Sequence, residues 1–348
     1  TQNLFQTGFD ATWEVDVFGG VRRSVEAAGA DIQAAEEYQR HVLVSLLSEV
    51  ARNYIETRSN QRRLTIAAEN ISSQQDTLEL TRTRFNAGLT SELDVAQAQA
   101  QLATTQSQVP VLEMLLAQAI HRLGVLLGQP PESLVDELVQ AAPIPAVPPE
   151  IPVGLPSELL HRRPDIRRSE RQLAAATARI GVATAELFPR FSLTGSFGTQ
   201  TDDIQHFLDR KSLFWSVGPT MSWPIFDAGR IRANIDVQDI RQQQALALYQ
   251  QAILIALEEV ENALVAYRQE QVRYRHLATA AKSNRRAFDL ANERYAKGLA
   301  DFLSVLESQR SLYVTEDALI QSEGRAVASL IAIYKALGGG WETETSPR

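Results

Sequence analysis

The residue types that most often catalyse reactions or bind metals are few in this sequence, and their spacing is unfavourable. The chain has five histidines and no cysteine. No two histidines have the His-x-x-x-His spacing that places a pair of zinc ligands on one helix face. Neither a Gly-rich phosphate loop nor a Gly-x-Ser-x-Gly nucleophile elbow occurs. We therefore predict no enzyme activity, no catalytic residue, no cofactor and no metal site. The histidines are His41, His121, His161, His206 and His276.

The distribution of charge excludes further classes of partner. The chain carries 34 Lys and Arg against 42 Asp and Glu, for a formal net charge of −8, and the basic residues form no block. This balance argues against nucleic acid as a partner. No run of apolar residues approaches the ~18 that a transmembrane helix needs, so we predict that no helix of this chain spans a membrane.

The most informative pattern is an internal repeat, because residues 13–128 recur without a gap 210 positions later. A period this long is too great for a solenoid, whose units have about 20–50 residues. It indicates a duplicated half-molecule and therefore a pseudo-symmetric architecture. The matched pairs include Trp13 and Trp223, Glu49 and Glu259, Arg84 and Arg294, and Gly88 and Gly298.

Each half of the repeat contains a segment in which apolar and polar residues alternate. The segments are residues 5–17 and 213–225, and a shorter third one covers residues 191–197. Transmembrane β-strands need about 9–11 residues of this pattern. A sheet packed on helices would show the same alternation in any single strand. We expect the apolar face to meet lipid, through Phe9, Trp13, Trp215, Val217 and Trp223.

Very long helices are predicted after these strands. No proline occurs from Gly19 to Phe85 or from Gly229 to Tyr295, and each stretch would span ~100 Å as a helix. Apolar and small residues with coiled-coil spacing predict the buried seam of the first helix. These seam residues are Val50, Tyr54, Thr57, Gln61, Leu64, Ala68 and Ile71.

A glycine is expected to end each long helix, at Gly88 and at Gly298, because the C′ position favours a left-handed residue. Returning helices are predicted over residues 92–127 and 302–337, so that each half forms a helical hairpin. Residues 129–156 contain eight prolines. This composition indicates a connector that lies outside the helical bundle.

The number of strands is too small for a closed barrel, and an open sheet edge is not viable in lipid. The second half has a predicted helix, residues 165–187, and a strand before its long strand. The counterpart of this region would lie before Thr1, so we expect the sequence to begin inside the first repeat of a protein with four strands. A barrel must then be shared between identical subunits.

Local motifs connect the chain with a known family. They are Leu159-Leu160-His161-Arg162-Arg163-Pro164-Asp165-Ile166, Ala185-Glu186-Leu187-Phe188-Pro189, Trp223-Pro224-Ile225-Phe226-Asp227-Ala228-Gly229, Arg294-Tyr295-Ala296-Lys297-Gly298, Leu306-Glu307-Ser308-Gln309-Arg310-Ser311-Leu312 and Tyr334-Lys335-Ala336-Leu337-Gly338-Gly339-Gly340-Trp341. These residues resemble the outer-membrane efflux duct family typified by TolC, and most closely its OprM-like branch. The likeness covers essentially the whole chain, without the N-terminal portion of the family.

The resemblance implies a mainly α fold with membrane β-strands. Such proteins are homotrimers with a shared 12-stranded outer-membrane β-barrel, continuous with a long α-helical coiled-coil barrel in the periplasm and surrounded by an equatorial domain. The implied partners are outer-membrane lipid, a periplasmic adaptor (membrane fusion) protein and an inner-membrane efflux transporter. The implied location is the outer membrane of a Gram-negative bacterium. Many OprM-like members carry a lipid on an N-terminal cysteine, and this sequence contains no cysteine.

The repeat and the resemblance together predict seven segments. They are residues 1–18 (outer-membrane strand of the first repeat), 19–128 (first periplasmic hairpin), 129–163 (proline-rich connector and equatorial domain), 164–189 (helix of the second repeat), 190–226 (outer-membrane strands of the second repeat), 227–338 (second periplasmic hairpin) and 339–348 (C-terminal tail).

The resemblance also implies a periplasmic gate at the hairpin tips, held shut by hydrogen bonds and ion pairs. Asp94 and Tyr295 match positions of the family pattern, whereas Ser304 replaces an acidic residue there. The gate candidates are therefore Asp94, Tyr295, Asp301 and Glu307. Asp94 has a second interpretation, because Ser91 and Asp94 have the spacing of a capping box. Both roles stay open for Asp94.

The same tips are the implied docking site for the adaptor. The residues expected to contact it are Ala87, Gly88, Leu89, Lys297, Gly298 and Leu299. In the alternative interpretation, both glycines only terminate helices and need no partner.

The function implied is that of an outer-membrane exit duct in a tripartite efflux system, which passively exports drugs or small toxic compounds. A type I secretion duct of the same fold is an alternative. A soluble coiled-coil scaffold is another, although it leaves the long strands without a purpose. Nothing in the residues identifies the cargo.

Overall fold

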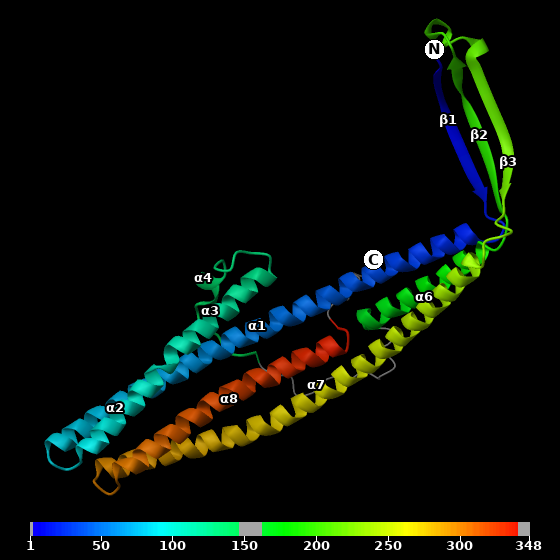
Figure 1. Cartoon of the computed structure of the whole chain (residues 1–348). Helices are drawn as coiled ribbons and strands as arrows, with labels where there is room; N and C mark the ends of the chain where they lie inside the picture. Colours follow the sequence, from blue (N-terminus) through cyan, green and yellow to red (C-terminus); the bar gives the residue numbers. More distant parts are fainter. Residues whose placement is uncertain (1–2, 146–161, 340–348) are drawn as a thin grey trace, which may run out of the picture. The chain divides into compact units, whose positions relative to one another are not determined.

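The computed structural model describes residues 3–145 and 162–339. The chain divides into two compact units, each built from two stretches of sequence. The first unit contains the three strands, and the second contains the tips of both helical hairpins (Figure 1). The first unit comprises Thr1–Gln39 and Pro164–Ile255, and the second comprises Arg40–Arg163 and Ala256–Arg348.

The strands form one antiparallel sheet in the order β1–β2–β3. β1 is Phe5–Val15, β2 is Arg190–Thr201 and β3 is Leu213–Ser222. The strand predicted at residues 191–197 is observed, but it is longer than predicted. Pairing with both neighbours continues past Phe197, although glycine and glutamine there hide the alternation on which the prediction relied.

The register gathers the apolar side chains of the three strands on one face. Phe9 pairs with Phe197, which in turn pairs with Trp215. Because directly opposed residues of neighbouring strands point to the same side of a sheet, these aromatic rings form one row. The other face is polar, and the hydroxyls of Ser196 and Ser216 lie 2.7 Å apart on it.

Phe214 is the exception on the polar face. It pairs with Gly198, which pairs with Gly8 in β1. A Cβ atom built on Gly198 would lie 2.9 Å from the ring of Phe214 and 2.7 Å from the Cα of Gly8. The paired glycines therefore leave room for the ring to lie across the sheet, an arrangement that compensates for the weak packing of glycine in strands.

The helices reproduce the repeat of the sequence. α1 (Gly20–Asn86) and α7 (Arg230–Ala296) have 67 residues each, and both their first and their last residues are 210 positions apart. Glycines with positive φ recur at the same interval. These glycines are Gly19 and Gly229, Gly88 and Gly298, and Gly128 and Gly338.

The returning helix of the first half is interrupted, so the prediction of one helix over residues 92–127 was wrong. α2 (Glu92–Gln106) and α3 (Gln108–Leu126) are separated at Ser107. Pro110 has no N–H to donate to the carbonyl of Gln106, and its ring crowds that carbonyl. The second returning helix, α8 (Phe302–Ala336), has Ile320 at the matching position and is continuous.

The region from Glu92 to Leu126 meets the length and composition criteria for a membrane span, which the search for an unbroken apolar run did not anticipate. It includes a window with a mean hydropathy of 1.4, which is long and apolar enough to cross a membrane by composition, and 28% of this window is buried in the chain. The sequence has no uninterrupted apolar run here, but frequent Ala, Val and Leu raise the average. One such helix is weak evidence for a membrane span, because helices of soluble proteins pass the same test.

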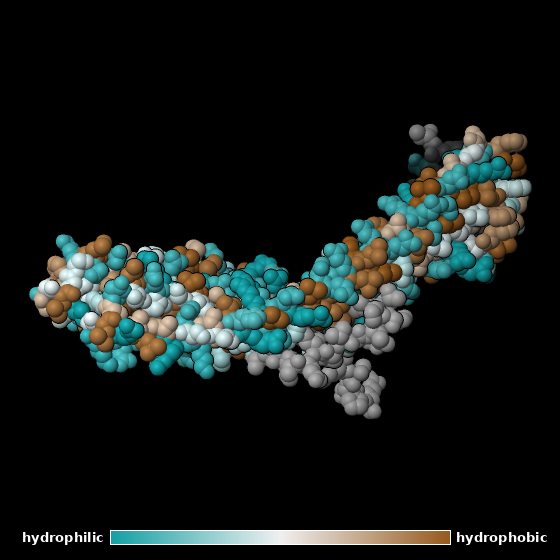
Figure 2. Space-filling view, turned by 90° about the horizontal axis from the view of Figure 1, so that it is seen from below, coloured by the Kyte–Doolittle hydropathy of each residue, from teal (hydrophilic) through white to brown (hydrophobic). Residues whose placement is uncertain are grey.

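The buried seam of α1 departs from the prediction after its first half. Thr57 and Gln61 are buried as predicted, but Ala67 is fully buried whereas Ala68 is exposed. The seam therefore changes register past Gln61. It is rich in polar residues throughout, and Figure 2 shows hydrophobic and hydrophilic side chains interspersed along the helices.

The connector is only partly described. Its first part contains α4 (Val135–Leu138), and Leu138 packs against Ile120 and Leu123 of α3. Arg58 of α1 donates a 2.8 Å hydrogen bond to the carbonyl of Gln140. Residues 146–161 of the predicted connector and 340–348 of the predicted tail lie outside the described residues. The predicted helix 165–187 is observed as α6 (Pro164–Ala185).

Candidate functional site

The two hairpin tips have the same backbone conformation. Gly88 and Gly298 adopt φ values of +71° and +74°. In the first tip, the amide of Leu89 donates a 2.8 Å hydrogen bond to the carbonyl of Arg84, and Leu299 bonds to Arg294 at the same distance. These bonds close a left-handed helix terminus that favours glycine. The turns therefore present Leu89 and Leu299 to solvent, each 65% exposed.

The returning helices α2 and α8 are each capped at the N-terminus by one serine and one aspartate, and these two residue types exchange positions between the tips. In the first tip, the Ser91 side chain accepts from the Asp94 amide, and the Asp94 carboxylate accepts from the Ser91 amide at 3.2 Å. In the second tip, the carboxylate of Asp301 accepts from the amide and the hydroxyl of Ser304 at 3.1 and 2.6 Å. The capping interpretation of Asp94 is thus confirmed.

These hydrogen bonds favour the ionised carboxylates. Partial burial raises the pKa of Asp94, but hydrogen bonds from Thr90 and Ser91 outweigh it, so that the pKa lies below its usual value. The negative charge of Asp301 raises the pKa of Asp94. Hydrogen bonds from the side chain and backbone of Ser304 lower the pKa of Asp301. Each tip therefore holds one ionised aspartate at neutral pH.

An arginine joins the two hairpins just above the tips. The guanidinium of Arg84, at the end of α1, donates a 2.9 Å hydrogen bond to the carbonyl of Tyr295 in α7. The guanidinium covers the Tyr295 ring, which is 1% exposed and packs against the ring of Phe302. These residues belong to a cluster that also contains Leu78 and Val305. The hydroxyl of Tyr295 is buried and has no hydrogen-bond partner among the described residues.

The predicted gate residues do not form one network within the chain. Asp94 and Asp301 interact as like charges, which repel each other. The ring of Tyr295 is buried beneath the guanidinium of Arg84, and Glu307 is exposed. Arg84 was not among the predicted gate residues, although an arginine stands four residues before the turn glycine in both repeats.

The predicted docking residues form two matched, exposed turns. Lys297 forms a 2.5 Å ion pair with Glu293, one helical turn earlier. This contact lowers the pKa of Glu293. The matching residue in the first tip is Ala87, so the two turns have similar shapes but different charges.

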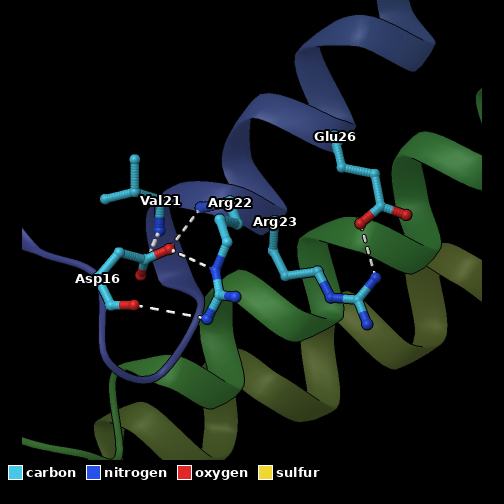
Figure 3. Close-up of polar contacts among 5 residues, drawn as sticks. All are labelled: Asp16, Val21, Arg22, Arg23 and Glu26. Atoms are coloured by element: carbon cyan, nitrogen blue, oxygen red, sulfur yellow. Dashed lines mark hydrogen bonds and ion pairs between the residues drawn. The ribbon is translucent and has the colours of Figure 1, made fainter.

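A second notable region is the junction where β1 leads into α1. Figure 3 shows the carboxylate of Asp16 at the first turn of the helix. It accepts from the amides of Val21 and Arg22 at 3.1 and 2.9 Å, and from the Arg22 side chain at 3.1 Å. One turn later, Arg23 pairs with Glu26 at 2.6 Å. Asp16 therefore ties the end of the strand to the start of the helix.

The junction between β3 and α7 uses a different aspartate. Asp227, which matches Val17 in the repeat, accepts from the amide of Ile231 at 2.7 Å. Aromatic side chains reinforce both junctions. Phe18 stacks on Phe188 with ring centroids 4.6 Å apart, and the indole of Trp223 donates to the carbonyl of Leu187. Trp223 thus lies beyond β3 rather than in the strand to which the alternation assigned it.

The described residues contain no group of three or more His, Asp or Glu side chains placed to hold a metal ion. What they do present is a sheet with unlike faces, helices with polar seams, and two exposed turns. These features suit the binding and passage of molecules.

Comparison with known proteins points in the same direction. The family model described as outer membrane efflux protein matches residues 1–129 and 155–339. The chain is 34% identical over 338 residues to the solvent efflux pump outer membrane protein SrpC of Pseudomonas putida. The aligned region covers 97% of this chain and 71% of that protein.

Two further comparisons agree with these. The chain is 36% identical over 345 residues to the pyoverdine export outer membrane protein OpmQ of Pseudomonas aeruginosa, covering 98% of this chain and 71% of that protein. Its structure is similar to that of the outer-membrane channel OprN, with a TM-score of 0.92 and 38% identity over 98% of this chain and 81% of that one.

Proposed function

Because this chain belongs to the outer membrane efflux protein family, it is an efflux duct of the Gram-negative outer membrane, and we propose that three copies assemble into one channel. In this trimer, β1, β2 and β3 of each copy supply nine strands of a shared 12-stranded β-barrel. The long helices of the three copies form the coiled-coil barrel in the periplasm, and the connector contributes to the equatorial domain.

The observation that carries the proposal is the division of the sheet into an apolar and a polar face. Phe9, Trp13, Trp215 and Val217 are exposed on one face, and the serine pair Ser196–Ser216 lies on the other. A sheet with one face in lipid and one in a water-filled channel requires this division. A sheet packed on helices would bury its apolar face instead.

The tips supply the proposed partner site and gate. Both exposed turns, with Leu89 and Leu299 at their apices, are the surface that we assign to a periplasmic adaptor protein, which links the duct to an inner-membrane transporter. Asp94, Tyr295, Asp301 and Glu307 remain the gate candidates, and they would act between copies because they form no shared network within one copy. We propose drugs and small toxic compounds as cargo, with a type I secretion duct as the alternative.

The test is to express the protein with an outer-membrane targeting leader in a strain that lacks its own efflux duct. We expect it to fractionate with the outer membrane, to migrate as a trimer before boiling, and to restore resistance when an adaptor and pump of a tripartite system are co-expressed. Recovery in the soluble fraction as a monomer would contradict the proposal. Restored secretion of a protein substrate without restored drug resistance would favour the type I alternative.

The proposed gate has its own measurement. Trimers carrying Asp94→Ala together with Tyr295→Phe are reconstituted in planar bilayers and compared with the parent. If these residues help to close the entrance, single-channel conductance rises. Unchanged conductance would leave Asp94 as a helix cap and Tyr295 as a core residue.

A further inference from the structure

The polar face of the sheet carries two charged residues along the paired part of β1, and both are negative. The register places the residues of β1 from Gln6 to Glu14 opposite positions of β2 and, through β2, of β3. Among the residues of these rows that lie on the polar face, the charged ones are Asp10 and Glu14. Arg190, at the end of β2, pairs with Glu186 at 3.6 Å. A cation on this face therefore meets two carboxylates in β1.

The row of Asp10 also contains two hydroxyl groups. Asp10 pairs with Ser196, which pairs with Ser216, and the Cβ atoms of directly opposed residues lie about 4.5–5.5 Å apart. The two serine hydroxyls lie 2.7 Å apart, within hydrogen-bond distance. Each hydroxyl has one hydrogen and two lone pairs, so their mutual bond leaves acceptor positions open. The row thus offers a negative charge and hydrogen-bond acceptors together.

An aromatic ring lies in the next row of the same face. Phe214 pairs with Gly198, which pairs with Gly8, and a carbon of its ring lies 2.9 Å from where a Cβ atom of Gly198 would be. The ring therefore rests on the glycine backbone, while Phe214 stays partly exposed. Gly8 precedes Asp10 by two residues, about 7 Å along the strand. The exposed side of the ring and the carboxylate are neighbours on one surface.

This combination of groups suits an organic cation. Aromatic rings attract ammonium groups through their negative faces, and a carboxylate beside the ring supplies the opposite charge. A metal ion is a poorer fit, because the described residues contain no group of three or more His, Asp or Glu side chains placed to hold one. We propose that Asp10, Phe214 and the Ser196–Ser216 pair form a binding site for an organic ammonium ion.

The site gives the proposed duct a class of cargo, and it rests on the proposed function because the polar face must line the channel. Three copies place three such sites around one passage at the same height. A molecule that crosses a channel must bind weakly enough to leave again. Cation–π contacts and ion pairs at exposed positions meet this condition, since each contributes little. Positively charged organic compounds are therefore held briefly in the barrel before they leave it.

The experiment measures block of the channel by tetraethylammonium. Full-length protein purified from membranes is reconstituted in planar bilayers in 1 M KCl, and the single-channel current is recorded as tetraethylammonium is added to both sides. Phe214→Leu should raise the apparent dissociation constant about 2–5-fold, because it removes an exposed cation–π contact. Phe214→Tyr keeps an aromatic ring and should bind like the parent. Asp10→Asn should weaken block at least as much as Phe214→Leu.

Glu14→Gln is the matched control for Asp10→Asn. Glu14 lies on the same face of the same strand, and it also has hydroxyl residues in its row, Ser192 and Thr220. The neighbouring row on this face holds Thr12 and its partners Thr194 and Gly218, which bring no ring. Glu14 is about 13 Å along the strand from Asp10, and screening extends only about 3 Å at this salt concentration. Block should therefore stay unchanged in Glu14→Gln.

A second probe tests the hydroxyl pair. Triethylammonium has one N–H to donate, whereas tetraethylammonium has none. Ser196→Ala combined with Ser216→Ala should therefore weaken block by triethylammonium and leave block by tetraethylammonium unchanged. An equal change for both probes would exclude the hydroxyls from the site.

The outcomes separate this inference from the proposed function. Stable channels that tetraethylammonium does not block, or that it blocks equally in the parent, Asp10→Asn and Phe214→Leu, would overturn the site and leave the duct standing. An equal loss in Asp10→Asn and Glu14→Gln would also overturn it, because the ring would then have no part. Absence of channels from the unmutated protein would overturn the proposed function itself. If Phe214→Leu fails to assemble, Asp10→Asn against Glu14→Gln still decides, since neither change alters the packing of the ring.

Discussion

The guanidinium of Arg84 lies 4.7 Å from the centre of the Tyr295 ring and also bonds to the carbonyl of that residue. This pair joins the end of α1 to the end of α7. Arg84→Ala should lower the free energy of unfolding by about 1–2 kcal/mol, because it removes a cation–π contact and a hydrogen bond. Hydrogen exchange at the Leu299 amide, next to the contact, should become faster in the same variant.

Tyr295→Phe is the matched control for this prediction. It keeps the ring under Arg84 and removes only a hydroxyl that has no partner among the described residues. We expect its stability to equal that of the parent. A loss comparable to that of Arg84→Ala would mean that the hydroxyl bonds to another copy, as a gate residue would.

The faces of the sheet predict a contrast between Val217 and Thr220. Val217 belongs to the apolar face and Thr220 to the polar face of the same strand. Val217→Arg should destabilise the assembled barrel by about 2–4 kcal/mol if the site lies at mid-bilayer, because the charge then enters lipid. Thr220→Arg should have a small effect, since its side chain lies on the polar face that we assign to the channel interior. Heat dissociation of unboiled trimers, read on gels, measures both, and equal losses would contradict the barrel assignment.

The capping box at the first tip predicts a local dependence on pH. The pKa of Asp94 in the folded chain lies below its usual value of 3.8, because hydrogen bonds from Thr90 and Ser91 outweigh the opposing effect of burial. A carboxylate with a lowered pKa stabilises the fold fully above the unfolded value and loses this effect as pH falls through the folded pKa. Amides of the first turn of α2 should therefore exchange faster relative to those in the middle of α8 below about pH 4.

The amide of Asp94 provides the complementary test. Ser91→Ala removes its acceptor and should cost about 1 kcal/mol of stability at neutral pH. Asp94→Asn should abolish the pH dependence of exchange in α2 while leaving α8 unchanged. If the pH dependence persists in Asp94→Asn, a different carboxylate controls the first tip.

The exposed turn leucines predict a loss of function without a loss of structure. Leu89→Asp combined with Leu299→Asp places a charge at the apex of both turns, where the proposed adaptor would bury an apolar side chain. Drug resistance should fall to the level of a strain without the duct, with normal amounts of trimer in the outer membrane. Val139→Asp, at a residue that is 64% exposed on the connector, is the control and should leave resistance intact. Normal resistance in the double variant would mean that the tips are not the docking surface.

The sequence allowed the long elements to be predicted because their signals are repeated and unambiguous. The helix ends at Asn86 and Ala296 follow from two turn glycines at positions 210 apart. The faces of β1 and β3 follow from alternation alone. Even the exchange of Ser and Asp between the caps of α2 and α8 is visible in the spacing of Ser91, Asp94 and Asp301.

The remaining features depend on packing that has no local signal. The register change after Gln61 places Ala67 rather than Ala68 in the seam, and nothing in the spacing distinguishes two adjacent alanines. Arg84 acts across 211 positions of sequence, so its partner became visible only in the folded chain. The break at Ser107 could have been predicted, because Pro110 lies inside the expected helix and proline disrupts helix interiors.

The repeat has a consequence for how this duct can evolve. A protein built from identical single hairpins would carry each substitution in every hairpin. Here the two hairpins share one polypeptide, so matching positions can diverge. Arg63 of α1 pairs with Asp317 of α8, whereas its counterpart in α7, Arg273, lies 3.7 Å from Glu270 of its own helix. Selection can therefore change the contacts of one hairpin without changing those of the other.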